Sequence, residues 1–251
     1  MKLPTLDTHT FQLTLPSSGK NITMRPYLVR EEKLLLMAQA SDNYDDHVSA
    51  VAQIITNCTN GEIDPKQVPY FDIEYLLLQL RSQSVGEISS PIYVCHNKPN
   101  EDEVECGHRT PIKINLTEIP VTGLNQPAEK FVIKLSDQYT LHLRYPTVYT
   151  VHKLTMAIVN KNVMSHNFFM EAICDLFATL ESHVDGKIYE FEEFTTVEKM
   201  EFLESLSTRN YEELVRFLDI MPTVEKSIQF TCEKCQFEHS INLAGVTDFL
   251  D

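Results

Sequence analysis

The organisation of the chain is clearest in the segment Phe131-Val-Ile-Lys-Leu-Ser-Asp-Gln-Tyr-Thr-Leu-His-Leu-Arg144. Apolar and polar residues alternate along both of its arms, and a Ser-Asp-Gln turn joins them. Alternation with a period of two is typical of strands that bury one face. The segment therefore predicts a β-hairpin.

A second hairpin of the same kind is predicted near the N-terminus. Its arms are Phe11-Gln-Leu-Thr-Leu15 and Asn21-Ile-Thr-Met-Arg25, and a Ser/Gly turn joins them. After each hairpin come an Arg and a Pro, then a Lys-Leu pair after six intervening residues, and then a Met-Ala pair. The two hairpins thus begin similar stretches of sequence.

Helical patterns follow both hairpins. In the first stretch, helix-forming composition and apolar spacing predict helices at 29–40, 46–58 and 71–84. In the second, a helix is predicted at 163–180, and two more follow before Pro222. Thr195-x-x-Glu198 and Asn210-x-x-Glu213 have the spacing of capping boxes for those two helices.

Each stretch closes on a strand, a cysteine pair and the tripeptide Ile-Asn-Leu, at 114–116 and 241–243. We therefore predict an α+β protein of two similarly ordered halves, residues 1–122 and 123–251, packed as one compact unit. A diverged internal duplication of about 120 residues explains this order. The alternative is chance similarity between two amphipathic segments.

The cysteines point to a metal site. Cys232-Glu-Lys-Cys235 has the C-x-x-C spacing that lets two thiolates from one tight turn bind the same Zn²⁺. A structural zinc needs four ligands, and Cys95 and Cys106 form the obvious second pair, although ten residues separate them. We predict one structural Zn²⁺ held by these four cysteines, joining the two halves.

Other interpretations of these cysteines remain open. His96, His108 or His239 could replace one cysteine as a ligand, and the C-x-x-C pair could instead be a redox dithiol. The thiols could also be unligated. Cys58 and Cys174 stand among apolar residues at helical spacing, so we expect both to be small buried side chains.

Net charge narrows the possible partners. Acidic residues outnumber basic ones 36 to 21, which gives a formal charge of −15. Affinity for nucleic acid or anionic lipid comes largely from Lys and Arg, so neither is an expected partner. No apolar run reaches the roughly 20 residues of a membrane span, and no signal peptide is evident. We expect the protein to fold in a reducing cytoplasm.

No catalytic motif is evident. The sequence has no phosphate-binding glycine loop, no His-Glu-x-x-His and no Gly-x-Ser-x-Gly. Its densest acidic strings, 101–105 and 190–193, are typical of a solvated surface. The sequence thus offers no reaction, and we expect the protein not to be an enzyme.

Two segments are candidates for contacts with other proteins. One is the acidic insertion at 97–105, and the other is the run of Phe191, Glu192, Glu193 and Phe194. An exposed aromatic residue at the centre of an interface can contribute more than about 2 kcal/mol to binding. Alternatively, both phenylalanines pack into the core beneath a loop.

Three segments resemble the baseplate hub and hub-assembly protein family of T-even-like contractile-tailed phages. They are Met1-Lys-Leu-Pro-Thr-Leu-Asp-Thr with Phe11-Gln-Leu-Thr-Leu-Pro-Ser-Ser-Gly-Lys20, then Arg25-Pro-Tyr-Leu-Val-Arg-Glu-Glu-Lys-Leu-Leu-Leu-Met-Ala38, and Phe71-Asp-Ile-Glu-Tyr-Leu-Leu-Leu-Gln-Leu-Arg-Ser-Gln-Ser-Val-Gly-Glu87. The resemblance is clearest over the first half, and the second half is similar mainly in length and layout.

The resemblance implies a late structural or assembly protein of the tail baseplate hub. Its partners would be other tail proteins, met in the host cytoplasm during assembly or within the virion, and no catalytic residues carry over. The alternative is a zinc-ribbon nucleic-acid-binding or regulatory protein. Near the cysteine pairs, however, Arg109, Lys113 and Lys234 are accompanied by many acidic residues.

Overall fold

Helices and strands are both well represented in the computed structural model, which describes residues 7–41, 43–98, 104–125, 131–160 and 163–249. The predicted α+β class is confirmed. The α-helices are α1 (Val29–Gln39), α2 (Tyr44–Cys58), α3 (Tyr70–Ser84), α4 (Val148–Asn160), α5 (Val163–Cys174), α6 (Thr196–Glu204) and α7 (Thr208–Leu218). Short 3₁₀ helices are η1 (Leu116–Glu118), η3 (Phe191–Glu193) and η4 (Val246–Phe249).

The strands form several small sheets, and all their pairings are antiparallel. The largest has the order β11-β10-β9-β8, from Ile188–Glu190, Phe177–Ser182, Tyr139–Leu143 and Val132–Lys134. A second has the order β13-β12-β7, from Glu238–Ala244, Thr223–Thr231 and Val121–Thr122. The pairs are β1-β2 (Phe11–Thr14, Asn21–Met24), β3-β6 (Ile88–Ser89, Ile114–Asn115) and β4-β5 (Ile92–Val94, Arg109–Pro111).

Both predicted hairpins form. In β1-β2, Phe11 pairs with Met24, and in β8-β9, Ile133 pairs with Leu141. The alternating apolar residues point inward, since Ile22, Met24, Ile133 and Leu141 are all buried. The predicted helices at 29–40, 46–58 and 71–84 correspond to α1, α2 and α3 within two residues at each end.

Helix α3 lies at the centre of the N-terminal body and is buried on several sides. Nine of its fifteen residues are buried. Ile73, Leu76 and Leu80 pack against the β1-β2 hairpin, α1 and α2, whereas Leu78 packs against β12, η1 and η4. These apolar residues lie on more than one side of the helix, so segments on both sides are needed to remove them from water.

Two carboxylates on α3 bind distant parts of the chain. Asp72 accepts hydrogen bonds from the backbone amide (3.0 Å) and the hydroxyl of Ser17 in the β1-β2 turn. Glu74 accepts bonds from the amide of Val246 (3.1 Å) and the hydroxyl of Thr223 (3.5 Å). Burial raises the pKa of both carboxyls, and these bonds counteract that effect.

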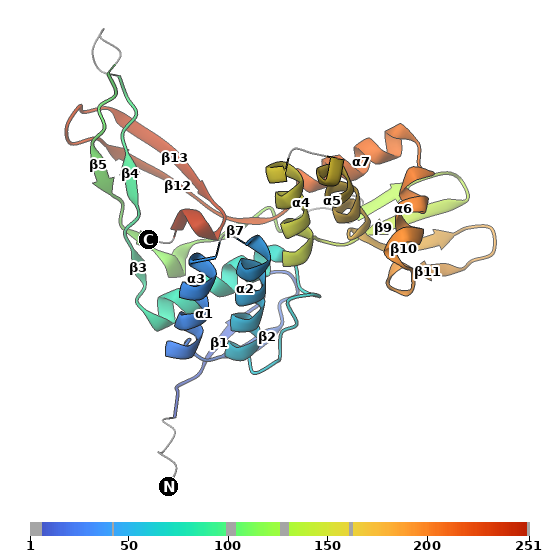
Figure 1. Cartoon of the computed structure of the whole chain (residues 1–251), viewed down its shortest axis with the longest axis horizontal. Coiled ribbons are helices and arrows are strands. Elements are labelled where there is room, and N and C mark those ends of the chain that lie inside the picture. Colours follow the sequence, from blue (N-terminus) through green and yellow to red (C-terminus); the bar gives the residue numbers. More distant parts are fainter. Residues whose placement is uncertain (1–6, 42, 99–103, 126–130, 161–162, 250–251) are drawn as a thin grey trace.

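The chain returns to its first half after α7. Figure 1 shows β12 and β13 lying beside β4 and β5, far from the lobe of α5 to α7. The core of that lobe uses residues from within 131–221 alone, whereas the core around Leu78 also uses Val224 and Phe249. Residues 223–249 therefore complete the N-terminal body. The proposed halves, 1–122 and 123–251, stay a prediction.

The order hairpin, helix, helix occurs twice, in β1-β2-α1-α2 and β8-β9-α4-α5. After these elements the order differs, because α3 follows α2 whereas the strands β10 and β11 follow α5. The predicted helix 163–180 was wrong beyond Cys174, since residues 177–182 form β10 and pair with β9. Apolar residues at 176, 177 and 180 fit either a helix or a buried strand, and pairing with β9 decides between them.

Helix α6 begins at the predicted capping box, in which Thr195 and Glu198 bond each other's backbone amides. Helix α7 begins earlier than predicted. Ser207 is its N-cap and accepts a bond from the amide of Asn210, so Asn210 lies within the first turn. Ser and Asn are both strong N-caps, and sequence alone does not rank them.

A buried ion pair joins the first hairpin to α1. The Glu31 carboxylate, which is fully buried, accepts bonds from the Arg25 guanidinium (2.9 and 3.2 Å), Arg30 (2.7 Å), the Leu28 amide (2.9 Å) and Asn57 (3.3 Å). Burial alone would raise the pKa of Glu31, but the Arg25 and Leu28 bonds outweigh it and lower the pKa to about 2.

Glu31→Gln should therefore lower the free energy of unfolding at neutral pH by about 3 kcal/mol, because Arg25 is left buried without its counter-charge. Because folding lowers the pKa of Glu31, its contribution to the free energy of unfolding is fully present above pH 4.5, the pKa of the unfolded chain. It is lost as the pH falls toward about 2. Urea denaturation at a series of pH values measures this. The exposed neighbour Glu32 gives the control, and Glu32→Gln should cost less than about 1 kcal/mol. Equal effects of the two variants would contradict the assignment.

Candidate metal centre

The four predicted ligand cysteines lie just beyond the strands of two hairpins, β4-β5 and β12-β13, and Figure 1 shows these hairpins side by side. Cys95 directly follows β4 and Cys106 precedes β5, while Cys232 and Cys235 lie in the turn between β12 and β13. Ring contacts of Tyr93 with Phe230 and His239 join the two hairpins below the cysteines.

The cysteine sulfurs converge at one point. The Sγ of Cys95 lies 3.7 Å from that of Cys235, and the Sγ of Cys106 lies 3.8 Å from that of Cys232. All four sulfurs lie within 4.8 Å of one another. These contacts are much longer than a disulfide bond of about 2.05 Å, and the cysteines are free. The four cysteines could hold a metal ion.

The backbone of the two turns is arranged in the same way. The Gly107 amide donates to the carbonyl of Cys95 (2.9 Å), and the Gln236 amide donates to that of Cys232 (2.9 Å). The residue after the second cysteine has positive φ in each turn, +64° at Gly107 and +59° at Gln236. Each pair therefore lies in a tight turn, although Cys95 and Cys106 are far apart in sequence.

Side chains around the sulfurs join one turn to the other. Nε2 of the buried His239 lies 3.1 Å from the Cys95 sulfur, and the Asn97 amide donates to the Cys235 sulfur (3.6 Å). The Lys234 ammonium donates to the carbonyl of Cys106 (2.8 Å). Such bonds orient thiolate ligands and spread their negative charge.

The histidines considered as substitute ligands differ in position. His96 is exposed, and its Nδ1 lies 2.7 Å from the Glu105 carboxylate. His108 is partly exposed and faces Glu233 at 4.0 Å. His239 alone of the three contacts a cysteine sulfur, from a position among aromatic rings.

The cysteine pKa values differ within the cluster. Burial raises the pKa of Cys95 and Cys106. Burial also acts to raise the pKa of Cys235, but the Phe237 amide and the Asn97 side chain outweigh it and lower the pKa to about 6. Cys235, the least buried of the four, therefore ionises more readily than Cys95 and Cys106.

Cys58 and Cys174 are buried in separate apolar clusters, as predicted. Burial raises the pKa of Cys58 to about 11 and that of Cys174 to about 12. Both thiols are therefore protonated at neutral pH and act as small apolar side chains.

The second group of predicted site residues, Phe191 to Phe194, forms η3 and the residue after it. Phe191 is only 4% exposed and packs in the core, whereas Phe194 is partly buried. Glu193 is exposed, and Glu192 accepts a bond from Arg144 (2.8 Å). Of the acidic insertion at 97–105, residues 99–103 lie outside the described residues.

The sequence offered His239 as a substitute ligand, but it did not show which cysteine His239 contacts or that Lys234 bonds to Cys106. His239 and Lys234 act on cysteines that are distant in the chain, so their roles depend on tertiary contacts. Only the position of His239 four residues after Cys235 could have suggested a link to the site.

Comparison with protein families decides the assignment. Residues 8–251 match the family described as T4 bacteriophage base plate protein. The chain belongs to this family. Neither curated proteins nor solved structures gave a match.

As a member of the T4 base plate family, the chain has a structural role in the phage tail baseplate. Membership also implies contacts with other tail proteins and a place in the virion tail. In the part of the chain that the structure describes, no helix is both long and apolar enough to cross a bilayer.

The two turns allow a test of their shared backbone conformation. Gly107→Ala should lower the free energy of unfolding by about 1 kcal/mol, because positive φ is unfavourable for a residue with a Cβ. The added Cβ meets no atom closer than 4.0 Å, so the cost comes from the backbone alone. Gln236→Gly should be neutral or stabilise by up to about 1 kcal/mol. Chemical denaturation at matched metal content measures both, and a neutral Gly107→Ala would argue against this conformation.

Proposed function

We propose that this protein is a structural or assembly component of the baseplate hub, held in shape by one Zn²⁺ bound to Cys95, Cys106, Cys232 and Cys235. The family match across nearly the whole chain carries the baseplate role. The hub, rather than another part of the baseplate, is inferred from the resemblance of the N-terminal segments.

The sulfur geometry supports a single tetrahedral ion. Four sulfurs at about 2.3 Å from one Zn²⁺ are about 3.8 Å apart. The two closest pairs, at 3.7 and 3.8 Å, match this spacing. Four thiolates leave no coordination position open for water or substrate, so the role of the ion would be structural.

A metal would stabilise a region that has little apolar packing. The cluster around the sulfurs consists of the four cysteines themselves, beyond the last apolar residues of the neighbouring core. Binding of the ion joins segments 126 and 140 residues apart in sequence. Such long-range closure is costly in chain entropy, and metal binding can offset that cost.

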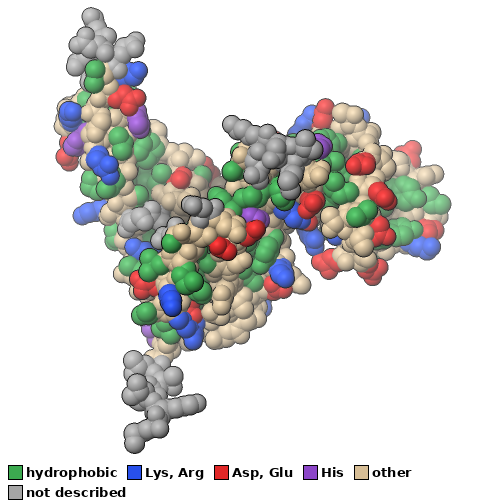
Figure 2. Space-filling model, in the orientation of Figure 1, with side chains coloured by type: hydrophobic (Ala, Val, Ile, Leu, Met, Phe, Trp, Pro, Cys, Tyr) green, Lys and Arg blue, Asp and Glu red, His purple; other side chains and the backbone are tan. Residues whose placement is uncertain are grey.

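The nucleic-acid alternative has less support. Lys234 is bonded to a carbonyl of the neighbouring turn. On the face in Figure 2, basic, acidic and histidine side chains are intermixed over the hairpin tips. A protein that binds the phosphate backbone needs a coherent basic surface, which a formal charge of −15 makes harder to build. We likewise infer that the protein acts through protein contacts and not by catalysis.

Purified protein should contain about one Zn per chain, because the four thiolates form one tetrahedral site. Chelation should lower the melting temperature, since the ion binds only the folded state. Cys232→Ser should lose the metal, whereas the matched substitutions Cys58→Ser and Cys174→Ser should retain it. Elemental analysis by mass spectrometry measures the content and distinguishes zinc from iron. Metal-free protein with an unchanged melting curve would rule out a metal site at these cysteines.

The baseplate role predicts a phenotype in the phage that encodes this chain. Loss of the gene should block tail assembly, and plasmid-encoded wild-type chain should restore infectious particles. Cys232→Ser should restore them poorly because the chain is destabilised, while Cys58→Ser should restore them better. Mass spectrometry of purified particles then separates a resident hub subunit from an assembly factor that leaves. Normal baseplates in its absence would contradict the proposal.

A further inference from the structure

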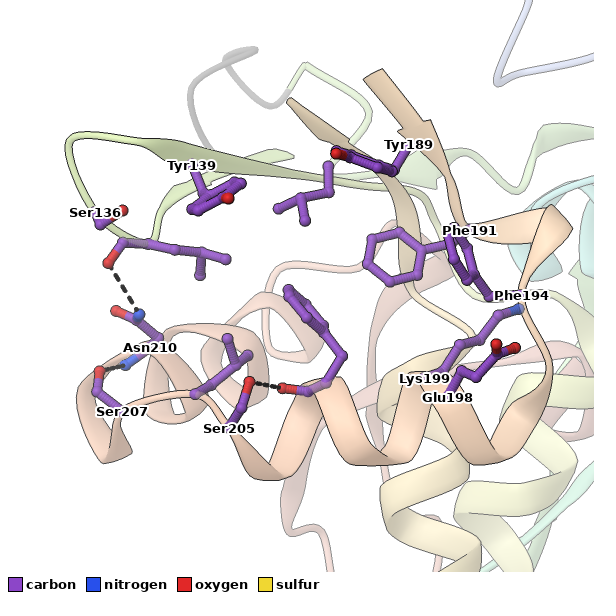
Figure 3. A pocket seen from close by; sticks show the side chains of 14 residues that line it. Ser136, Tyr139, Tyr189, Phe191, Phe194, Glu198, Lys199, Ser205, Ser207 and Asn210 are labelled. Carbon is purple, nitrogen blue, oxygen red and sulfur yellow. Dashed lines mark hydrogen bonds between the residues drawn. The ribbon is translucent and has the colours of Figure 1, made fainter. Parts of the chain in front are cut away.

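The C-terminal lobe contains an open slot between its sheet and α6 (Figure 3). Its volume is about 650 Å³, within the range of sites that bind ligands. One wall comes from strands β9 to β11 and the β8-β9 turn, and the other from α6 and the start of α7. Phe191 and Phe194 lie together at one end, with Glu198 and Lys199 opposite them.

The surfaces of the slot are mainly apolar and partly open to solvent. Tyr139 is 37% exposed and Tyr189 is 36% exposed, and both line the slot from the sheet side. Phe202 and Leu206 line it from the helix side and are partly buried. Aromatic residues that are half exposed beside a cavity are typical of binding sites, because their remaining surface can still be removed from water.

Several polar groups along the helix side of the slot already have partners within the chain. The Ser205 hydroxyl donates to the carbonyl of Phe202 (2.6 Å), Ser207 accepts from the Asn210 amide (3.2 Å), and the Asn210 side chain donates to the carbonyl of Leu135 (3.5 Å) (Figure 3). An occupant therefore needs to supply apolar atoms rather than new hydrogen bonds. This favours a hydrophobic side chain over a polar small molecule.

The charge around the slot is strongly acidic. Residues 181–213 contain ten Asp or Glu and only three Lys or Arg. Of the three cations, Lys187 is paired with Asp185 and Arg209 with Glu213, whereas Lys199 lines the slot beside Glu198. No ion pair joins Glu190 or Glu193 to another described residue, and these glutamates directly precede the slot residues Phe191 and Phe194 in the chain. Figure 2 shows acidic side chains spread over this lobe.

We propose that this slot is the docking site for a basic segment of another tail protein, which inserts one or two bulky apolar side chains between the sheet and α6. This inference rests on the proposed baseplate role and gives that role a binding surface. The apolar walls would provide the binding energy, and the unpaired glutamates would attract and orient the segment. Phe191 and Phe194 then form the end wall of the slot. Phe191 can contribute to binding in this position although it is buried.

The chain contains no tryptophan, which makes a direct test possible. The probe is a synthetic basic peptide that has a single Trp and a Leu flanked by lysines. The control is an acidic peptide of the same design, with glutamates in place of the lysines. With the full chain, the basic peptide should bind saturably, with a blue shift and raised anisotropy of its Trp emission. The acidic peptide should not bind. Affinity should fall as salt is added, and Glu190→Gln combined with Glu193→Gln should weaken that salt dependence.

Two substitutions, one inside the slot and one on α6 outside it, test whether the basic peptide binds in the slot or elsewhere on the surface. Leu206→Phe adds bulk inside the slot and should weaken binding of the basic peptide by about tenfold. Val197→Phe adds the same side chain at an exposed position of α6 outside the slot and should change affinity less than about twofold. Circular dichroism checks folding. If Leu206→Phe does not fold, Ser205→Phe replaces it, because that side chain begins exposed and lines the slot.

Three results would overturn the proposal: no binding, equal binding of both peptides, or equal affinity of the Leu206→Phe and Val197→Phe proteins. A dimer in sedimentation that Leu206→Phe dissociates would also overturn it, by assigning the slot to a second copy. These measurements use purified protein, so they do not depend on the phage experiment. Normal particle yield with a folded Leu206→Phe chain would reject docking in the baseplate while leaving the baseplate role intact.

Discussion

Helix α3 buries apolar side chains on more than one side, and the rest of the N-terminal body is arranged to cover them. The β1-β2 hairpin, α1 and α2 cover one side, and β12, η1 and η4 cover another. Since apolar surface must be removed from water, α3 requires segments from both ends of the chain. Asp72 and Glu74 add directed bonds at these two contacts, so the same helix also fixes where the segments lie.

Much of this fold could be predicted from short-range signals. Both hairpins, the first three helices and the Thr195 capping box follow from alternation, spacing and capping chemistry within a few residues. The end of α5 could not be predicted, because the apolar residues after Cys174 suit a helix as well as a strand, and only pairing with β9 selects the strand. The pairing of β12 with β7 could not be predicted either, because it depends on which apolar surface of α3 the earlier segments leave exposed.

The candidate sites divide in the same way. Thiols are few and chemically distinctive, so their spacing alone indicated the four cysteines that come together. The contact of His239 with Cys95 depends on tertiary geometry and could not be read from spacing. The Phe191 to Phe194 run was recognised, but its sequence did not show which aromatic side chain enters the core. That difference arises from the short 3₁₀ helix, which turns Phe191 inward and leaves Phe194 partly open.

The return of residues 223–249 to the first half has a consequence for synthesis. A ribosome releases the segments that surround α3 first, but the strand β12 and the short helix η4 that finish covering it emerge only after residues 131–221. The lobe built from residues 131–221 draws its core from a contiguous stretch, so it can fold while the earlier segments still lack their final cover. The N-terminal body is thus completed only after the lobe has been synthesised, and a chain truncated before Thr223 would expose the apolar surface of α3 around Leu78.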